Sequence, residues 1–206
     1  MTTEAFNPGV VDWSGENPGI YLRDTESSPW LSLCVFFRVV LSDHGRGTGV
    51  VLIGAPAENK GVSHNNVCIS DNEPLMRYLV KEFVTKFGSF REATGLQAMT
   101  YLPLVDCTTS ARGSDSYSEV IRADSVEVAL RWEQLGVPFA ADVPVERSPT
   151  NAHQMYSVFR EAKQASISVN GKPLPGRVTL RDFHGRRTTT AFLAFSETWI
   201  RHSQLA

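Results

Sequence analysis

The segment from Leu31 to Leu41 constrains the fold more than any other part of the chain, because its side chains alternate with a period of two. That period is typical of a β-strand with one face buried against a core. A second, β-branched run, Thr48–Ile53, follows after a short loop that contains Gly45. Two such runs separated by a short glycine-containing loop indicate a β-hairpin. One face of the first strand is uniformly apolar: Leu31, Leu33, Val35, Phe37, Val39 and Leu41.

Further strands are indicated along the chain by β-branched and aromatic runs that lie between turn residues. They are predicted at Gly19–Leu22, Val67–Ile69, Leu96–Val105, Glu119–Arg122, Val126–Trp132, Val137–Val145, Tyr156–Val169, Val178–Phe183 and Thr188–Ile200. Ser, Gly and Asp dominate residues 110–118, which predicts a loop there. The pair Asn170-Gly171 predicts a two-residue hairpin turn, because both residues accept a positive φ.

One amphipathic helix is predicted over residues 73–87. Asn72 is a suitable cap, and Pro74 suits the first helical turn. Apolar residues then recur at spacings of three and four, which is the period of a helix with one buried face. They are Leu75, Met76, Leu79, Val80, Phe83, Val84 and Phe87.

The strands do not alternate with helices, so the pattern argues against a parallel doubly wound sheet. It predicts a mainly β fold with one long amphipathic helix. The expected arrangement is an antiparallel closed or nearly closed barrel, with a two-sheet sandwich as the alternative. Closure would also protect the edges of so many strands. Residues 1–29, rich in Asn, Pro and Gly, predict an irregular N-terminal arm, and residues 30–206 predict a single β-rich domain.

The composition excludes several classes of partner. A net charge of −2 argues against a nucleic-acid-binding surface, which needs clustered Lys and Arg. The apolar runs are far shorter than the roughly 20 residues of a membrane span, and the first residues do not resemble a signal peptide. The three cysteines are widely spaced, which predicts free thiols rather than disulfides or a zinc site. We therefore expect a cytoplasmic protein that contacts neither nucleic acid nor membrane.

Four segments of the C-terminal half resemble the repeats of one known family. Residues 126–132 and 136–139 are similar to a strand followed by a Gly-x-Pro-x turn, and residues 167–171 are similar to a strand that ends in a tight turn. Gly176 followed by residues 181–185 resembles a glycine and an Arg-Asp-His signature, although no tryptophan stands there. These segments resemble the lipocalin-like carotenoid hydratases. The resemblance implies a calycin-like barrel and transfers no catalytic residue.

The turn at residues 182–187 is the first candidate site. Asp182 and His184 lie two residues apart, so on a strand they would share one face. The carboxylate would then orient the imidazole as a general base, with Arg186 nearby to hold an anionic group. The alternative is a solvated hairpin end with surface ion pairs of little energy.

A second candidate site lies on the strands themselves. Tyr156 and Arg160 share one face of a predicted strand, where they would supply polar groups to an apolar pocket. Trp132 is one of several strand-borne aromatic residues that would line a cavity if the barrel is incompletely filled. Core packing is the alternative for these aromatic residues.

Three functions remain open on this reading. The first is binding of a small, largely apolar organic molecule in a barrel cavity. The second is a hydro-lyase or isomerase that acts on such a molecule, and the third is an oligomeric interaction protein, such as a homo-oligomer. The sequence contains no phosphate-binding loop, dinucleotide fingerprint or metal-ligand spacing, so we expect no cofactor and no metal.

Overall fold

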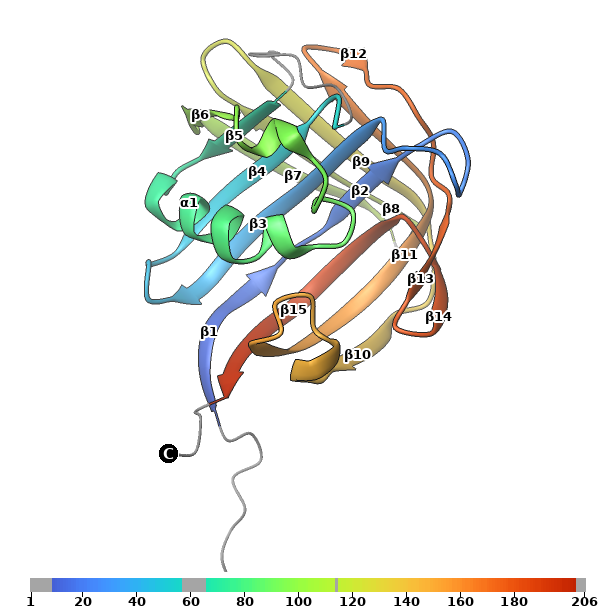
Figure 1. Ribbon diagram of the computed structural model, residues 1–206. Coiled ribbons are helices and arrows are strands. Elements are labelled where there is room, and N and C mark those ends of the chain that lie inside the picture. Colours follow the sequence, from blue (N-terminus) through green and yellow to red (C-terminus); the bar gives the residue numbers. More distant parts are fainter. Residues whose placement is uncertain (1–8, 57–65, 114, 203–206) are drawn as a thin grey trace, which may run out of the picture.

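The computed structural model describes residues 9–56, 66–113 and 115–202, which form a mainly β structure (Figure 1). The strands are β1 Gly9–Glu16, β2 Gly19–Leu22, β3 Ser32–Ser42, β4 Gly47–Ile53, β5 Asn66–Ser70, β6 Thr100–Pro103, β7 Asp106–Arg112, β8 Ser116–Arg122, β9 Glu127–Leu135, β10 Phe139–Val143, β11 His153–Val169, β12 Lys172–Pro173, β13 Leu180–Phe183, β14 Arg186–Thr189 and β15 Ala191–His202. The α-helix is α1 Glu73–Glu82, and the short 3-10 helices are η1 Val84–Lys86, η2 Thr94–Leu96 and η3 Val145–Arg147. The predicted β-rich fold is confirmed.

Most strands belong to one large sheet, whose main path has the order β6-β5-β4-β3-β1-β15-β11-β9-β8-β7. β3 and β4 pair as the predicted antiparallel hairpin. A purely antiparallel sheet was predicted. However, β5 and β6 pair in parallel, so the sheet is mixed. β13 and β14 form a separate two-stranded sheet. The Asn170-Gly171 turn is also confirmed, with φ values of 49° and 74° between β11 and β12.

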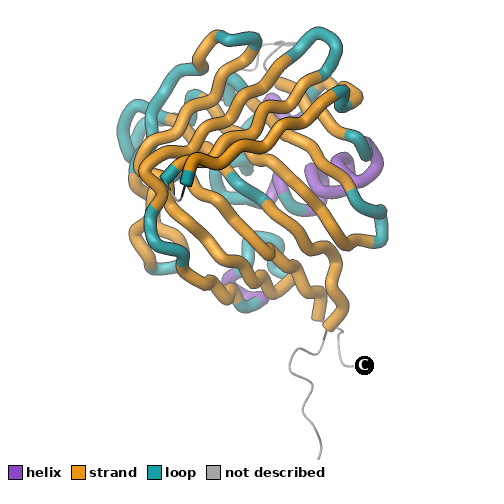
Figure 2. The backbone as a smooth tube through the Cα atoms, turned by 180° about the vertical axis from the view of Figure 1, so that it is seen from behind, coloured by secondary structure: helices purple, strands orange, loops and turns teal. Residues whose placement is uncertain are grey.

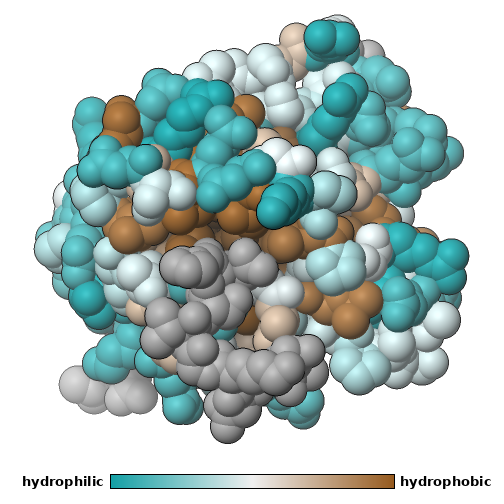
Figure 3. All heavy atoms as spheres, turned by 90° about the horizontal axis from the view of Figure 1, so that it is seen from above, coloured by the Kyte–Doolittle hydropathy of each residue, from teal (hydrophilic) through white to brown (hydrophobic). Residues whose placement is uncertain are grey.

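The two halves of the large sheet face each other, as Figures 1 and 2 show from front and back. A cluster of buried apolar side chains lies between them. We call this the inner core. It joins Phe36 and Leu52 of the first half to Leu130 and Trp132 of the second. Seen from above, hydrophobic residues form a band between hydrophilic margins (Figure 3).

A second cluster, the outer core, lies on the opposite face of β1 and β3 and is covered by α1. Trp13 is at its centre, with the rings of Phe37 and Phe83 edge-on at 5.7 and 5.8 Å. The alternation predicted for residues 31–41 explains the two cores, because Leu33 and Val35 enter the outer core while Cys34 enters the inner one.

The helix α1 is shorter than the predicted 73–87. Asn72 caps it as expected, since its side-chain oxygen accepts a hydrogen bond from the Leu75 N–H. The α-helix ends because Phe83 leaves the helical region, with φ −126° and ψ −59°. This turn places the Phe83 ring on Trp199, 5.1 Å away between centroids, and the chain continues as η1.

Leu79→Ala is expected to lower the free energy of unfolding by about 2–5 kcal/mol, because Leu79 is fully buried in the outer core and the truncation leaves a cavity. Leu41→Ala makes the same chemical change at a side chain that is 54% exposed, so it should cost far less. Urea denaturation measures both values. Equal losses in the two variants would contradict the packing of α1.

Two local predictions need correction. In the described part of the predicted irregular arm, residues 9–29, β2 is the strand that was predicted at Gly19–Leu22, but β1 was not predicted, and β1 pairs with both β3 and β15. The arm's backbone hydrogen bonds therefore go to the sheet, despite its Gly and Pro content. The predicted loop at 110–118 is the tip of the β7–β8 hairpin, in which Ser110 pairs with Ser118. Exposed β7 lacks the apolar alternation by which strands are recognised.

The cysteines and the helices complete the outline. Cys34, Cys68 and Cys107 are free thiols, and the first two are buried. Among the residues described, no helix has the length and apolar character required to cross a membrane.

Candidate functional site

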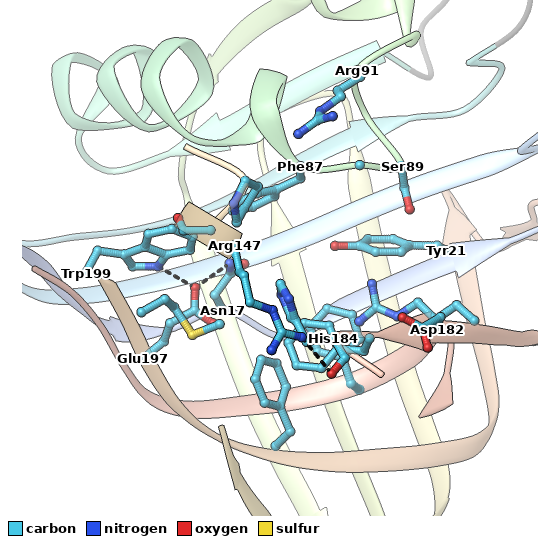
Figure 4. A pocket seen from close by; sticks show the side chains of 18 of the residues that line it. Asn17, Tyr21, Phe87, Ser89, Arg91, Arg147, Asp182, His184, Glu197 and Trp199 are labelled. Atoms are coloured by element: carbon cyan, nitrogen blue, oxygen red, sulfur yellow. Dashed lines mark hydrogen bonds between the residues drawn. The ribbon is translucent and has the colours of Figure 1, made fainter. Parts of the chain in front are cut away.

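A cavity of about 790 Å³ opens beside the outer core. Small-molecule sites commonly have volumes of roughly 300–1,000 Å³. Figure 4 shows its walls: the segment after η1 on one side, and the loop after η3 and the β13–β14 hairpin on the other. Aromatic side chains make up much of the lining: Tyr21, Trp30, Phe87, Phe159, Phe183, Phe192 and Trp199.

The floor of the cavity is formed by β2, β11 and β15, and a bulge in β15 determines which side chains it presents. Ser196 has a φ of 52°, and the pairing with β11 shifts register at this point. Before the bulge, Phe192 and Ala194 face the outer core, whereas after it Trp199 does so. The bulge therefore places Glu197 on the cavity face, where strict alternation would have turned it toward the inner core.

Glu197 is buried, with an exposed fraction of only 3%, yet it lines the cavity. Its Oε1 accepts two hydrogen bonds, one from Trp199 Nε1 at 2.7 Å and one from Asn17 Nδ2 at 3.1 Å (Figure 4). Burial raises the pKa of Glu197 to about 7, although these two donors act in the opposite direction. A buried carboxyl with such a pKa is typical of functional sites.

Arg181 of β13 lines the same cavity and lies among aromatic rings. Its guanidinium carbon is 4.6 Å from the ring centre of Phe192 and 5.3 Å from that of Tyr21. Burial lowers the pKa of Arg181 from its usual value. Its Nε is buried and has no hydrogen-bond partner among the described residues. A buried donor without a partner is costly, so this N–H requires an acceptor that the described residues do not supply.

The loop after η3 and the β13–β14 hairpin are held together by Arg147, which donates a hydrogen bond to the carbonyl of His184 at 3.0 Å. His184 has a φ of 54°, within the tight turn that reverses the hairpin. Asp182 stabilises this turn by accepting the Gly185 N–H at 3.0 Å. Burial lowers the pKa of the His184 imidazole, and Arg147 and Arg181 add to the effect.

The structure brings two of the sequence-predicted residues, Asp182 and His184, to the cavity. However, the Asp182 carboxylate holds the backbone of the turn, and no hydrogen bond joins it to the His184 ring among the described residues. Arg186 lies elsewhere, with its guanidinium 3.9 Å from the ring centre of Phe139.

The remaining predicted residues also lie outside the cavity lining. Tyr156 faces Gln154, whose amide donates to its hydroxyl, and Arg160 donates to the carbonyl of Gly136. Trp132 is fully buried in the inner core, where its Nε1 donates to the carbonyl of Gly19. Tyr156, Arg160 and Trp132 therefore do not form the second candidate site together. Their positions on the strands direct their side chains away from the cavity.

Three residues that the sequence analysis did not select converge on the cavity: Asn17, Arg181 and Glu197. They come from segments far apart in the chain, and no local sequence pattern brings the three together. The one available signal was an acidic side chain, Glu197, between the aromatic residues Phe195 and Trp199. A charged group inside an apolar strand is unusual enough to mark a functional candidate.

The described residues contain no cluster of three or more His, Cys, Asp or Glu side chains able to hold a metal ion. Comparison of the chain with protein-family models, with curated proteins and with solved structures gives no match.

Proposed function

We propose that this protein binds a small organic acid with an aromatic or otherwise apolar body in the cavity beside the outer core. The carrying observation is Arg181, a half-buried cation whose Nε is buried and has no hydrogen-bond partner among the described residues, beside the aromatic walls of that cavity. A carboxylate on the ligand would accept this N–H and compensate the positive charge. The aromatic rings would contact the apolar body.

Binding of 2-naphthoate, compared with its neutral analogue 2-naphthamide, tests this proposal by isothermal titration calorimetry. The native protein should prefer the acid, and Arg181→Gln should weaken 2-naphthoate binding by about 10–100-fold, because a hydrogen bond to a charged group is lost. Arg187→Gln is the matched control. Arg187 stands in the same hairpin, is 61% exposed and pairs with Glu26, so its loss should leave binding unchanged.

A cavity-filling variant gives an independent check. The Ser89 side chain points toward Tyr21 across the cavity (Figure 4). Ser89→Trp should therefore block the acid and the amide alike while the protein keeps its cooperative thermal transition. Equal affinity of the native protein for both probes, or full binding in Arg181→Gln, would disprove the proposal.

The geometry also favours a second candidate function, in which the bound molecule is the substrate of a hydro-lyase or isomerase. Glu197 supports it, since a carboxyl with a pKa of about 7 is suited to proton transfer near neutral pH. Glu197→Gln should then abolish turnover and leave the binding of 2-naphthoate intact. An oligomeric interaction protein stays a prediction, to be checked by sedimentation at two protein concentrations.

The barrel form also stays a proposal. β6 and β7 lie at opposite ends of the strand order, yet only residues 104 and 105 separate them in the chain. Arg38 of β3 and Glu119 of β8 form an ion pair from the two halves of the sheet at 2.9 Å. Both observations support a sheet curled into a nearly closed, calycin-like barrel. The ligand cavity, however, lies outside the inner core.

A further inference from the structure

The polar groups of the cavity fall into two separate sets. Figure 4 shows Glu197, Asn17 and Trp199 on one side of the cavity and Asp182, the neighbour of Arg181 in the chain, on the other. Tyr21 and Phe192 pack on Arg181, so aromatic surface adjoins the arginine side. A ligand that fills the cavity would therefore meet a cation at one end and the Asn17–Glu197 pair at the other.

The Asn17–Glu197 pair has unused acceptors. Both N–H donors that reach Glu197 go to the same oxygen, Oε1. Its other oxygen, Oε2, has no hydrogen-bond partner within the described ranges. The side-chain Nδ2 of Asn17 donates its hydrogen bond to Glu197. The Oδ1 of Asn17 is buried and has no hydrogen-bond partner among the described residues.

Buried polar atoms in native proteins are almost always satisfied, so the buried and unpaired Oδ1 of Asn17, beside a carboxyl oxygen that is also unpaired among the described residues, requires an explanation. Asn17 is 4% exposed and Glu197 is 3% exposed, which leaves the cavity as the direction from which a partner can come. The amide oxygen of Asn17 can only accept a hydrogen bond, and Oε2 accepts one when Glu197 is ionised, so the missing partner is a donor. A hydroxyl also suits the protonated form of Glu197, because the hydroxyl oxygen can accept a hydrogen bond from the acid.

We infer that Asn17 and Glu197 form a second ligand subsite that accepts a hydrogen bond from a hydroxyl group of the bound acid. The ligand class becomes a hydroxylated aromatic acid, with its carboxylate at Arg181 and its hydroxyl at the far end of the apolar body. This inference rests on the proposed function, because it places the second polar group of the same ligand.

Calorimetric titration of four related probes tests the subsite. They are 2-naphthoate and its three isomeric hydroxy derivatives, with the hydroxyl at position 5, 6 or 7. The native protein should bind at least one hydroxy isomer about tenfold or more tightly than 2-naphthoate, since a site built to pair a hydroxyl rejects the analogue that lacks it. Glu197→Gln keeps an oxygen for Trp199 and Asn17 but replaces the free acceptor by a donor. It should reduce the preference to less than about threefold and leave 2-naphthoate affinity nearly unchanged.

Asn17→Leu is the second variant, which removes the unpaired Oδ1, and it should reduce the same preference. Arg181→Gln should instead weaken all four probes together and preserve the preference. No preference in the native protein, or a preference that survives in both subsite variants, would overturn the inference while leaving the proposed function standing. Failure of every probe to bind, by contrast, would refute the proposed function itself.

Discussion

Arg38→Met is expected to cost about 3–5 kcal/mol of unfolding free energy, because it leaves a buried carboxylate without its cation. Glu119 is completely buried and is paired with Arg38 at 2.9 Å. It also accepts hydrogen bonds from Tyr117 at 2.6 Å and from Thr109 at 2.8 Å. Arg38 in turn contacts Glu16 at 2.5 Å, so one guanidinium joins the two halves of the sheet. Urea denaturation measures the loss.

Arg122→Met is the matched control, since Arg122 also holds two carboxylates, those of Asp106 and Glu127, each at 2.7 Å. These groups are well exposed, and surface ion pairs contribute about 0–1 kcal/mol. If the two methionine variants lost equal stability, the Arg38 cluster would not be the link between the sheet halves that the geometry indicates.

Asp12→Ala is expected to destabilise the protein by a similar amount, about 3–5 kcal/mol at neutral pH, because several donors share this one buried carboxylate. His153 Nε2 donates to it at 2.7 Å and the Tyr78 hydroxyl at 2.6 Å, and Arg201 completes the set. These partners come from β11, α1 and β15, so Asp12 of β1 connects four elements around the outer core.

The stability that Asp12 supplies should depend on pH. Burial acts to raise its pKa, but the hydrogen bonds from His153, Tyr78 and Arg201 outweigh this and lower the pKa from 3.8 to about 2. A carboxyl whose folded pKa is depressed stabilises the fold above its unfolded pKa and loses that contribution as the pH falls. The native protein should therefore lose about 2 kcal/mol from this group between about pH 4 and pH 2.

Acid titrations of thermal stability check this dependence. Asp12→Ala should lack the corresponding part of the acid loss, whereas Asp106→Ala, at a carboxylate that is 51% exposed, should retain it. An unchanged acid profile in Asp12→Ala would show that the cluster does not hold the Asp12 carboxylate ionised.

Local pattern predicted much of the fold. The alternation at residues 31–41, the cap at Asn72 and the Asn170-Gly171 turn are all statements about neighbours in sequence, and the structure confirms each. Strands without such a pattern were missed: β1 is stabilised by the strands on both sides, and β7 is exposed along its length. The end of α1 depends on the packing of Phe83 against Trp199. The spacing of apolar residues along a helix gives no information about such a contact between distant residues.

The candidate site was predictable only where it coincides with a turn. Asp182 and His184 lie at the end of the β13–β14 hairpin, which lines the cavity, and such loops could be selected because they commonly carry functional side chains. Glu197 faces the cavity only because of the bulge at Ser196. The alternation of apolar residues along the strand does not indicate a register shift at this position. Its partner Asn17 lies 180 positions earlier in the chain, a contact that one sequence does not reveal.

The position of β15 has a consequence for how the protein is made. Residues 191–202 follow every other strand that the structure describes, yet β15 lies inside the sheet and pairs with β1, β2 and β11. A nascent chain whose β15 is still within the ribosome therefore exposes two strand edges and the apolar face of the outer core. Such species aggregate readily, and pairing between distant segments is slow. The cavity, which takes Glu197 and Trp199 from β15, forms only when this strand docks, so ligand-binding competence should appear together with that docking step.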